Sequence, residues 1–413
     1  MTVMMLAKNS VRFLVLVILI ACTGIGHDSA ANEPFIIDRS QAKLKTELIL
    51  GAERTESYIP LIKGKAVAVV ANHTSMVGSV HLIDTLIALG VDLKHVYAPE
   101  HGFRGDRDAG AHIEDEKDQK TGLPIFSLHG RSKKPSPGSL NGIDVVLFDI
   151  QDVGVRFYTY ISTLHYVMEA CAENGIELIV LDRPNPHASY VDGPVLQREF
   201  SSFVGMHPVP VVYGMTIGEY ARMILGEKWI EASDDLELKV IPCLNYTHNT
   251  EYSLPIPPSP NLPDNSSVIL YPSLCFFEGT VVSIGRGTDH PFQVVGHPLF
   301  SIGSHSFTPQ SNYGAKHPKL EGKSCFGQFL GEGVAEVVQK RKQLDLSYLI
   351  GYHDFLCDKI DFFSERKFFD KLAGTDELRV QLVSGMKEED IKKTWHSDIE
   401  AFKTTRAKYL IYP

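Results

Sequence analysis

The chain has 413 residues, too many for one ordinary hydrophobic core, so two domains are the starting expectation. Hydrophobic residues make up 44% of it and charged residues 22%, which is the balance of a folded globular protein and not of a disordered one. The formal net charge of −10, with no Lys/Arg cluster after the N-terminal segment, argues against a nucleic acid as partner.

The N-terminal segment has the pattern of a secretory signal. Two basic residues precede an unbroken apolar run over residues 13–21, which is too short to cross a bilayer. The run ends in Leu-Ile-Ala-Cys and resembles a bacterial lipoprotein signal, in which Cys22 is lipidated. The alternative is ordinary cleavage further on, near Ala30. We predict a lipoprotein signal over residues 1–22, a polar spacer over residues 23–48, and a lipid-anchored protein on the periplasmic side of the inner membrane.

The cysteines give no metal or redox motif. Besides Cys22 there are five, widely spaced, with no CxxC pair and no Cys/His zinc pattern. We expect most of them to be small buried apolar residues. A single disulfide among them is the alternative.

From residue 65 onward, apolar runs typical of buried parallel strands alternate with helix patterns. Strands are expected at residues 65–71, 95–97, 124–128, 144–150, 176–181, 209–212 and 236–241, and helices at 80–89, 159–173 and 216–225. Thr216 and Glu219 have the spacing of a capping box. The alternation predicts an α/β fold, a Rossmann-like parallel sheet with helices on both faces.

A proline-dense stretch, residues 254–263, interrupts the alternation. We place a domain boundary there, between a Rossmann-like catalytic domain over residues 49–260 and a smaller C-terminal α/β (α+β) domain over residues 261–413. The stretch is either an inert linker, the commoner case, or part of the lining of a cleft between the domains. In the second domain, helices are expected at residues 344–356 and 390–409.

Polar side chains follow four of the predicted strands, at the end where parallel α/β sheets bind ligands. They are Asn72 after the first strand, Glu100, His101 and Arg104 after the second, Asp149, Gln151, Arg156 and Tyr158 after the fourth, and Asp182 and Arg183 after the fifth. Two interpretations are open. Asp149 with Arg156, and Asp182 with Arg183, are candidate structural ion pairs. Otherwise the side chains gather around a ligand, since bringing unpaired charges into a crevice costs desolvation.

In the predicted second domain, Glu278 and Arg286 lie on two glycine-containing loops, residues 276–280 and 283–288. One interpretation places both charges opposite the strand ends of the first domain, across a cleft. The other is a surface ion pair on structural turns, which contributes little to stability.

The motifs that would indicate other chemistry are missing from the sequence. There is no Gly-x-Ser-x-Gly elbow, no Walker A motif and no GxGxxG motif. A metal site from His73, Glu100, His101, Asp106, Asp108 and His112 would lack any recognised ligand spacing. Carboxylates, amides and the aromatic residues Phe103, Phe157, Tyr158 and Tyr160 suit a sugar. Glycoside hydrolysis needs a carboxylic acid to protonate the leaving oxygen, and Glu100 is our candidate.

Six motifs in one order are informative together: residues 99–105 (PEHGFRG), 149–160 (DIQDVGVRFYTY), 181–186 (LDRPNP), 257–263 (PPSPNLP), 278–280 (EGT) and 285–288 (GRGT). From about residue 51 to the C-terminus, the chain resembles the exo-acting β-N-acetylmuramidase family. The resemblance implies release of single N-acetylmuramic acid residues from the non-reducing ends of peptidoglycan fragments, without a metal or organic cofactor. It also implies a Rossmann-like domain joined to a smaller α/β domain, with the active cleft between them.

The resemblance indicates the substrate more firmly than the residue roles, so we assign roles from chemistry. The catalytic candidates are Glu100 as the acid, Glu278 as the second carboxylate, and His101. The substrate-binding candidates are Asn72, Arg104, Asp149, Gln151, Arg156, Tyr158, Asp182, Arg183 and Arg286. Of these, the four arginines compete to bind the lactyl carboxylate, a planar group that suits a guanidinium.

The expected partner is a glycan, with no nucleic acid, contact with a membrane only through the lipid anchor, and a monomer or dimer as the oligomeric state. Two alternatives stay open at this point. One is a non-catalytic periplasmic muropeptide-binding protein that uses the same cleft. The other is a metal-dependent hydrolase built around His101.

Overall fold

The structure is a computed structural model that describes residues 47–413, apart from residues 100–102, 104–115 and 131. Residues 47–413 form one compact unit. The predicted lipoprotein signal with Cys22 lies outside the described residues, and so do Glu100, His101 and Arg104.

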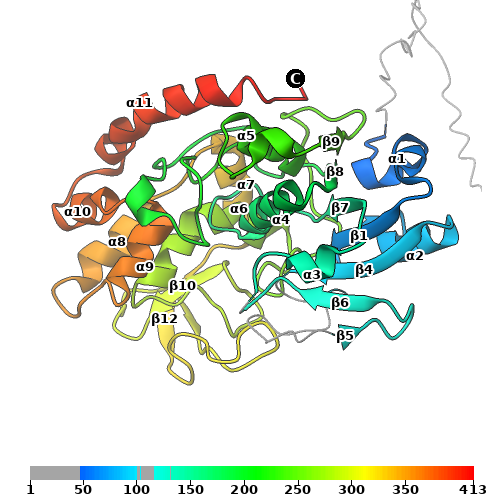
Figure 1. Ribbon diagram of the computed structural model, residues 1–413. Helices are drawn as coiled ribbons and strands as arrows, with labels where there is room; N and C mark the ends of the chain where they lie inside the picture. The colour runs from blue at the N-terminus through cyan, green and yellow to red at the C-terminus, as the bar shows by residue number, and fades with distance from the viewer. Residues whose placement is uncertain (1–46, 100–102, 104–115, 131) are drawn as a thin grey trace, which may run out of the picture. The chain divides into compact units, whose positions relative to one another are not determined.

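A seven-stranded sheet forms the centre of the first half of this unit (Figure 1). Its strands are β1 (Ala66–Ala71), β4 (Asp92–Ala98), β5 (Glu116–Lys117), β6 (Pro124–Ser127), β7 (Val145–Asp149), β8 (Glu177–Leu181) and β9 (Leu238–Ile241). The spatial order is β5-β6-β4-β1-β7-β8-β9, and only β5 among them runs antiparallel to its neighbour. The chain fills one side of β1 first and then the other, so the connections diverge between β1 and β7. In such sheets this switch point is where ligands bind.

Both faces of the sheet are buried, because alternate residues of each strand enter different apolar clusters. In β1, Val67 and Val69 pack with α1 (Thr55–Ile62) and α2 (Leu82–Ala88), whereas Ala68 and Val70 pack with α4 (Tyr160–Asn174) and α5 (Ile217–Gly226). The helices of this half are α1 (Thr55–Ile62), α2 (Leu82–Ala88), α3 (Pro137–Leu140), α4 (Tyr160–Asn174) and α5 (Ile217–Gly226), with short 3-10 helices η2 (Gly51–Glu53), η3 (Arg198–Phe200) and η4 (Ser233–Asp235) and a hairpin of β2 (Met76–Val77) and β3 (Val80–His81).

The second half is a small antiparallel sheet with helices around it. The strands are β10 (Val294–His297), β11 (His305–Phe307) and β12 (Cys325–Phe329), in the order β10-β12-β11. The helices are α6 (Asn265–Leu274), η5 (Cys275–Gly279), α7 (Gly331–Arg341), α8 (Ser347–Leu356), α9 (Arg366–Ala373), α10 (Glu377–Val383) and α11 (Glu388–Arg406). Their buried side chains join the same cluster as α4 and α5, so the two halves share one core.

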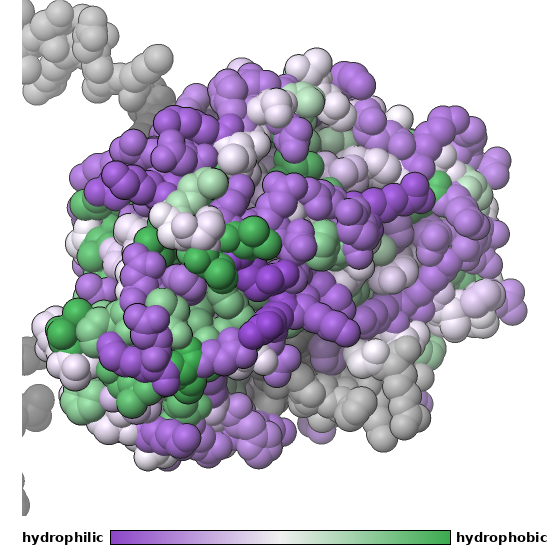
Figure 2. Space-filling view, turned by 90° about the vertical axis from the view of Figure 1, so that its left-hand side faces the viewer, coloured by the Kyte–Doolittle hydropathy of each residue, from purple (hydrophilic) through white to green (hydrophobic). Residues whose placement is uncertain are grey.

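The surface carries apolar patches on the side where α10, α8 and β12 lie in Figure 1. Figure 2 views that side and shows hydrophobic residues gathered toward its lower left, within a largely hydrophilic surface. Within the residues that the structure describes, no helix is both long and apolar enough to cross a membrane.

The predicted fold class is confirmed: a parallel α/β sheet with a second, smaller part. The capping box at α5 also forms, with Thr216 and Glu219 bonding reciprocally. The strand predicted at residues 209–212 is wrong, because Val212 makes only isolated bridges, to Val155 and Asp192. The five described cysteines are free thiols, so the single disulfide weighed as an alternative does not form among them.

Candidate active site

The proline-dense stretch packs against the carboxyl ends of the central strands and is not an extended linker. Pro257 lies beside the residue that follows Asn72 at the end of β1, with its carbonyl oxygen 2.8 Å from Nε2 of His73. The Tyr158 hydroxyl, on the loop after β7, donates to the Pro258 carbonyl oxygen at 2.8 Å. The stretch is therefore fixed beside the switch point of the sheet.

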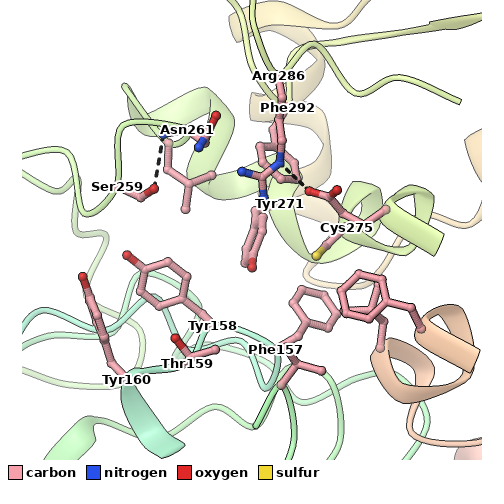
Figure 3. A pocket seen from close by; sticks show the side chains of 15 residues that line it. Phe157, Tyr158, Thr159, Tyr160, Ser259, Asn261, Tyr271, Cys275, Arg286 and Phe292 are labelled. Carbon is pink, nitrogen blue, oxygen red and sulfur yellow. Dashed lines mark hydrogen bonds and ion pairs between the residues drawn. The ribbon is translucent and has the colours of Figure 1, made fainter. Parts of the chain in front are cut away.

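A cavity of about 220 Å³ lies where this stretch, the loop after β7 and the second half of the chain meet (Figure 3). Its walls are Phe157, Tyr158, Thr159, Tyr160, Val204, Ser259, Asn261, Leu262, Tyr271, Cys275, Glu278, Arg286, Phe292, Phe368 and Leu372. Two wider hollows adjoin it. One of about 610 Å³ shares Glu278 and Arg286 with the cavity, and one of about 410 Å³ shares Ser259 with it. Arg286 lines the first two of these three hollows.

Glu278 and Arg286 form an ion pair in the wall of the cavity. Nε of Arg286 donates to Oε1 of Glu278 at 2.5 Å, and the two side chains are 34% and 20% exposed for Arg286 and Glu278 respectively. Burial disfavours the guanidinium charge, but the Glu278 charge and hydrogen bond outweigh it and raise the pKa of Arg286. The sequence left a cleft site and a surface ion pair open, and the structure places the pair in the cavity wall.

Tyrosine hydroxyls supply much of the remaining polar lining of the cavity. Burial, followed by the neighbouring Tyr160, raises the pKa of Tyr158 far above its usual range, and burial does the same for Tyr271. Both therefore stay neutral. The Tyr160 hydroxyl accepts from Nδ2 of Asn72 at 2.9 Å, so Asn72 positions a cavity tyrosine and does not line the cavity itself.

Cys275 is a thiol in the cavity wall, and its surroundings do not activate it. Burial raises the pKa of Cys275, and the charge of Glu278 raises it further. Because the thiolate is the nucleophile, this environment does not suit covalent catalysis.

Asp149 and Arg183 pair with each other, so neither of the two ion pairs suggested by the sequence forms. Nε and Nη2 of Arg183 donate to the two carboxylate oxygens of Asp149 at 2.6 and 2.9 Å, and both side chains are buried. Nη2 of Arg183 also donates to the Met76 carbonyl oxygen. The pair bridges the ends of β7 and β8, and neither residue lines the cavity.

Arg156 is fully buried and is occupied by backbone carbonyl oxygens. Its Nη1 donates to Pro194 and Val209, and its Nη2 to Leu372 and Ala373, all at 2.7 to 2.9 Å. Burial lowers the pKa of Arg156 to about 9. We therefore remove Arg156 from the substrate-binding candidates: it joins the two halves of the chain.

The side chains of Asp182 and Gln151 also make hydrogen bonds to other groups of the protein. Asp182 accepts hydrogen bonds from Thr216, Gly218 and Tyr412. Gln151 donates from its side-chain amide to the carbonyl oxygens of Asp152 and Pro184. Neither side chain lines this cavity, and neither do those of Asn72, Asp149 and Arg183.

Of the predicted site residues that the structure describes, three meet at the cavity: Tyr158, Glu278 and Arg286. Glu100, His101 and Arg104 lie outside the described residues, and so do Asp106, Asp108 and His112 of the metal hypothesis. Within the described part of the chain, no three His, Cys, Asp or Glu side chains cluster closely enough to hold a metal ion.

Several lining residues were missed by the sequence analysis. Tyr271, Phe292 and Phe368 come from α6, the loop before β10 and α9, and no local motif marks them. Ser259 and Asn261 lie in the proline-dense stretch, where the alternative of a cleft lining was the signal that could have found them. The amide of Asn261 donates to the Gly314 carbonyl oxygen at 2.7 Å, which ties the stretch to the second half.

The fold and the cavity together indicate a protein that binds a small polar molecule. A polar and aromatic hollow at the switch point of a Rossmann-like sheet, with a carboxylate and a guanidinium in its wall, suits a small polar ligand that carries hydroxyl groups and an anion.

Comparison with known proteins is consistent with this class. Residues 67–266 match the family described as exo-beta-N-acetylmuramidase NamZ, N-terminal, and residues 269–412 match its C-terminal counterpart. The chain is 37% identical over 386 residues to the peptidoglycan beta-N-acetylmuramidase NamZ of Bacillus subtilis, covering 86% of this chain and 89% of that protein. The chain belongs to the exo-β-N-acetylmuramidase NamZ family.

Two crystal structures of DUF1343 family proteins from Bacteroides fragilis share the fold. One is 46% identical with a TM-score of 0.82, and the other is 30% identical with a TM-score of 0.71. Each comparison covers 89% of this chain and 99% of the other chain. The likeness therefore extends across both halves of the structure and the cavity between them.

Proposed function

We propose that this protein is an exo-acting β-N-acetylmuramidase, which hydrolyses the glycosidic bond of terminal N-acetylmuramic acid at the non-reducing ends of peptidoglycan fragments in cell-wall turnover. The observation that carries the proposal is the 37% identity to the Bacillus subtilis enzyme over most of both chains. The cavity supports it, since it offers tyrosine, amide, carboxylate and guanidinium groups to one polar ring.

The proposed reaction needs two groups with different tasks. A carboxylic acid gives its proton to the glycosidic oxygen as the bond from that oxygen to the anomeric carbon breaks. A water molecule then gives its hydroxyl group to the anomeric carbon, and its remaining proton restores the carboxylic acid. We assign the proton donor to Glu100, with His101 beside it in the sequence. Glu278, in the cavity wall, is the proposed second carboxylate, whose negative charge would stabilise the positive charge that develops on the sugar.

The assignment is tested with two variants and a chromogenic N-acetylmuramic acid glycoside. Glu100→Gln should lower kcat by several orders of magnitude, and Glu278→Gln by about 10²- to 10³-fold, the usual effect of losing one electrostatic group. Each variant should keep the circular dichroism spectrum of the parent. Wild-type rates in a folded Glu100→Gln protein would remove Glu100 from the mechanism.

We also propose that the protein is lipidated at Cys22 and held on the periplasmic side of the inner membrane. The support is the apolar run ending in Leu-Ile-Ala-Cys. Incorporation of labelled palmitate should be seen with the parent protein and lost in Cys22→Ser. If the label is never incorporated and the protein fractionates as a free periplasmic species, ordinary cleavage after secretion is the better account.

A further inference from the structure

We infer that Arg286 is the residue that binds the lactyl carboxylate of N-acetylmuramic acid, and so distinguishes this sugar from N-acetylglucosamine. The inference rests on the proposed function and deepens it, because it names the group that sets the substrate preference. The two sugars differ by a lactyl ether, and that ether carries the only carboxylate.

The arginines predicted at the site differ in whether their guanidinium groups are already bound by other groups of the protein. Arg156 gives its Nη atoms to four carbonyl oxygens, and Arg183 gives its guanidinium to Asp149 and a carbonyl oxygen. Arg286 is the one arginine among the described residues that lines the cavity. Its Nε is bound to Glu278, and no described residue accepts a hydrogen bond from either of its Nη atoms. These two groups remain available for a planar anion.

The glycine-containing turn and the Phe292 ring hold Arg286 in place before any ligand arrives. Gly285 and Gly287 flank it with φ of +79° and +80°. A Cβ on Gly287 would lie 2.4 Å from the Gln310 carbonyl oxygen, and one on Gly285 would lie 2.4 Å from Val294. The turn therefore requires glycine on both sides. The guanidinium carbon lies 5.3 Å from the centre of the Phe292 ring, within cation–π range.

The carboxylate of Glu278, which pairs with Arg286, is also held in place. Lys319 donates from its ammonium group to the carbonyl oxygens of Phe277, Glu278 and Thr280, which clamps the end of η5 that carries Glu278. Figure 3 shows Arg286 with Phe292 and Tyr271 on one side of the hollow, opposite Tyr158 and Tyr160. A guanidinium anchored at Nε and open at both Nη atoms is preorganised for a carboxylate, which lowers the entropy cost of binding.

The position of Arg286 also fits a substituent on a ring. The side chain lines both the cavity of about 220 Å³ and the adjoining hollow of about 610 Å³. A sugar ring in the first space would therefore reach Arg286 through a substituent that projects toward the second, and the lactyl ether is a substituent of this kind.

Paired glycosides of N-acetylmuramic acid and N-acetylglucosamine test the inference. Arg286→Lys keeps the charge but loses the planar fork, and it should lower the preference for the muramic acid glycoside, as the ratio of kcat/KM values, by about 10- to 100-fold, mostly through KM. Arg379→Lys is the matched control. Arg379 forms a part-buried ion pair with Asp370 away from the cavity lining, so its variant should leave the ratio unchanged.

Binding of the free sugars gives a readout that does not depend on turnover. Arg286→Lys should weaken the binding of free N-acetylmuramic acid in calorimetry and leave the binding of N-acetylglucosamine unchanged. If Arg286→Lys lowers kcat/KM for both glycosides equally, Arg286 has a structural role and the inference fails. If the parent protein hydrolyses neither glycoside, the proposed function itself fails.

Discussion

Arg156 is a single side chain that fastens two distant segments of the chain to each other. Its guanidinium reaches carbonyl oxygens near residues 194 and 209 in the first half and at residues 372 and 373 in the second. It has no carboxylate partner among these contacts, so its charge is balanced by carbonyl dipoles alone. Such an arrangement needs all of its hydrogen bonds, because a buried carbonyl group without a donor is costly.

We therefore predict that Arg156→Met is strongly destabilising. The substitution removes a donor from four buried carbonyl oxygens, of which that of Val209 keeps a second donor in the Leu196 N–H. It should lower the free energy of unfolding by more than about 3 kcal/mol. Urea unfolding followed by tryptophan fluorescence measures the change. Arg366→Met is the control, because its pair with Asp361 is 63% exposed on both sides and should change stability by less than about 1 kcal/mol. A change at Arg156 no larger than that of the control would contradict the structural role.

Asp182 should give the protein a measurable pH dependence of stability. Burial, and the charge of Glu219, raise its pKa from 3.8 to about 7, although the Tyr412 and Thr216 hydroxyls work against the shift. A carboxyl whose pKa is raised in the folded state stabilises that state fully below its ordinary pKa, and loses this contribution as pH rises through about 7.

The difference between the parent and Asp182→Asn isolates this contribution. We expect the parent to lose stability relative to the variant as pH rises from 5 to 8, because only the parent must ionise a buried carboxyl. Urea midpoints at several pH values check this. A constant difference between the two proteins across the range would show that Asp182 does not titrate there.

Single residues also show why sequence alone could not complete the site. The sequence located acids and arginines at the strand ends, but Asp149 lies nearer in sequence to Arg156 than to Arg183, its partner in the structure. Which charges pair depends on the order β1-β7-β8 in space, and no local pattern contains that order. Tyr271 could not be predicted either, since it lies on α6 and no local motif marks it as a residue of the cavity wall.

At the scale of elements, the C-terminal tail acts as a strap over the first half. The main-chain N–H groups of Ile411 and Tyr412 donate to Oε1 of Glu219, and the Tyr412 hydroxyl donates to Asp182 at 2.6 Å. The Pro413 carbonyl oxygen accepts from the main chain of His248. Ile411 and Tyr412 thus donate hydrogen bonds to two buried carboxylates of the first half, those of Glu219 and Asp182.

Tyr412→Phe tests the strap with the loss of one oxygen atom. The Cys243 N–H loses its acceptor and Asp182 loses a donor, so we expect a loss of about 1 to 3 kcal/mol. Differential scanning calorimetry measures it as a lower Tm. Tyr348→Phe is a suitable control, because Tyr348 is only partly buried and its hydroxyl makes no hydrogen bond to a described residue. An unchanged Tm for Tyr412→Phe would mean that the tail is not fastened as described.

Elements with a strong local pattern were the easiest to predict. The buried run at residues 144–150 forms β7 (Val145–Asp149), and the amphipathic pattern at 390–409 forms α11 (Glu388–Arg406). The strand prediction for residues 209–212 was wrong because these apolar residues pack in the core without a neighbouring strand to pair with. Burial, rather than strand formation, accounts for its composition.

For the whole molecule, the shared core predicts cooperative unfolding of both halves. One apolar cluster runs from α4 and α5 through α6 to α11, and Arg156 bridges the halves. We expect residues 47–413 to show a single calorimetric transition whose calorimetric and van't Hoff enthalpies agree. Two separate transitions would contradict the single core, and would favour the independent domains expected from chain length.

The measurement that tests the account most directly is incubation of the protein with a disaccharide of N-acetylmuramic acid β-linked to N-acetylglucosamine, with the products separated by liquid chromatography. The account predicts that both free monosaccharides form, in equal amounts and with catalytic turnover. Binding of the disaccharide by folded protein without any release of N-acetylmuramic acid would contradict it.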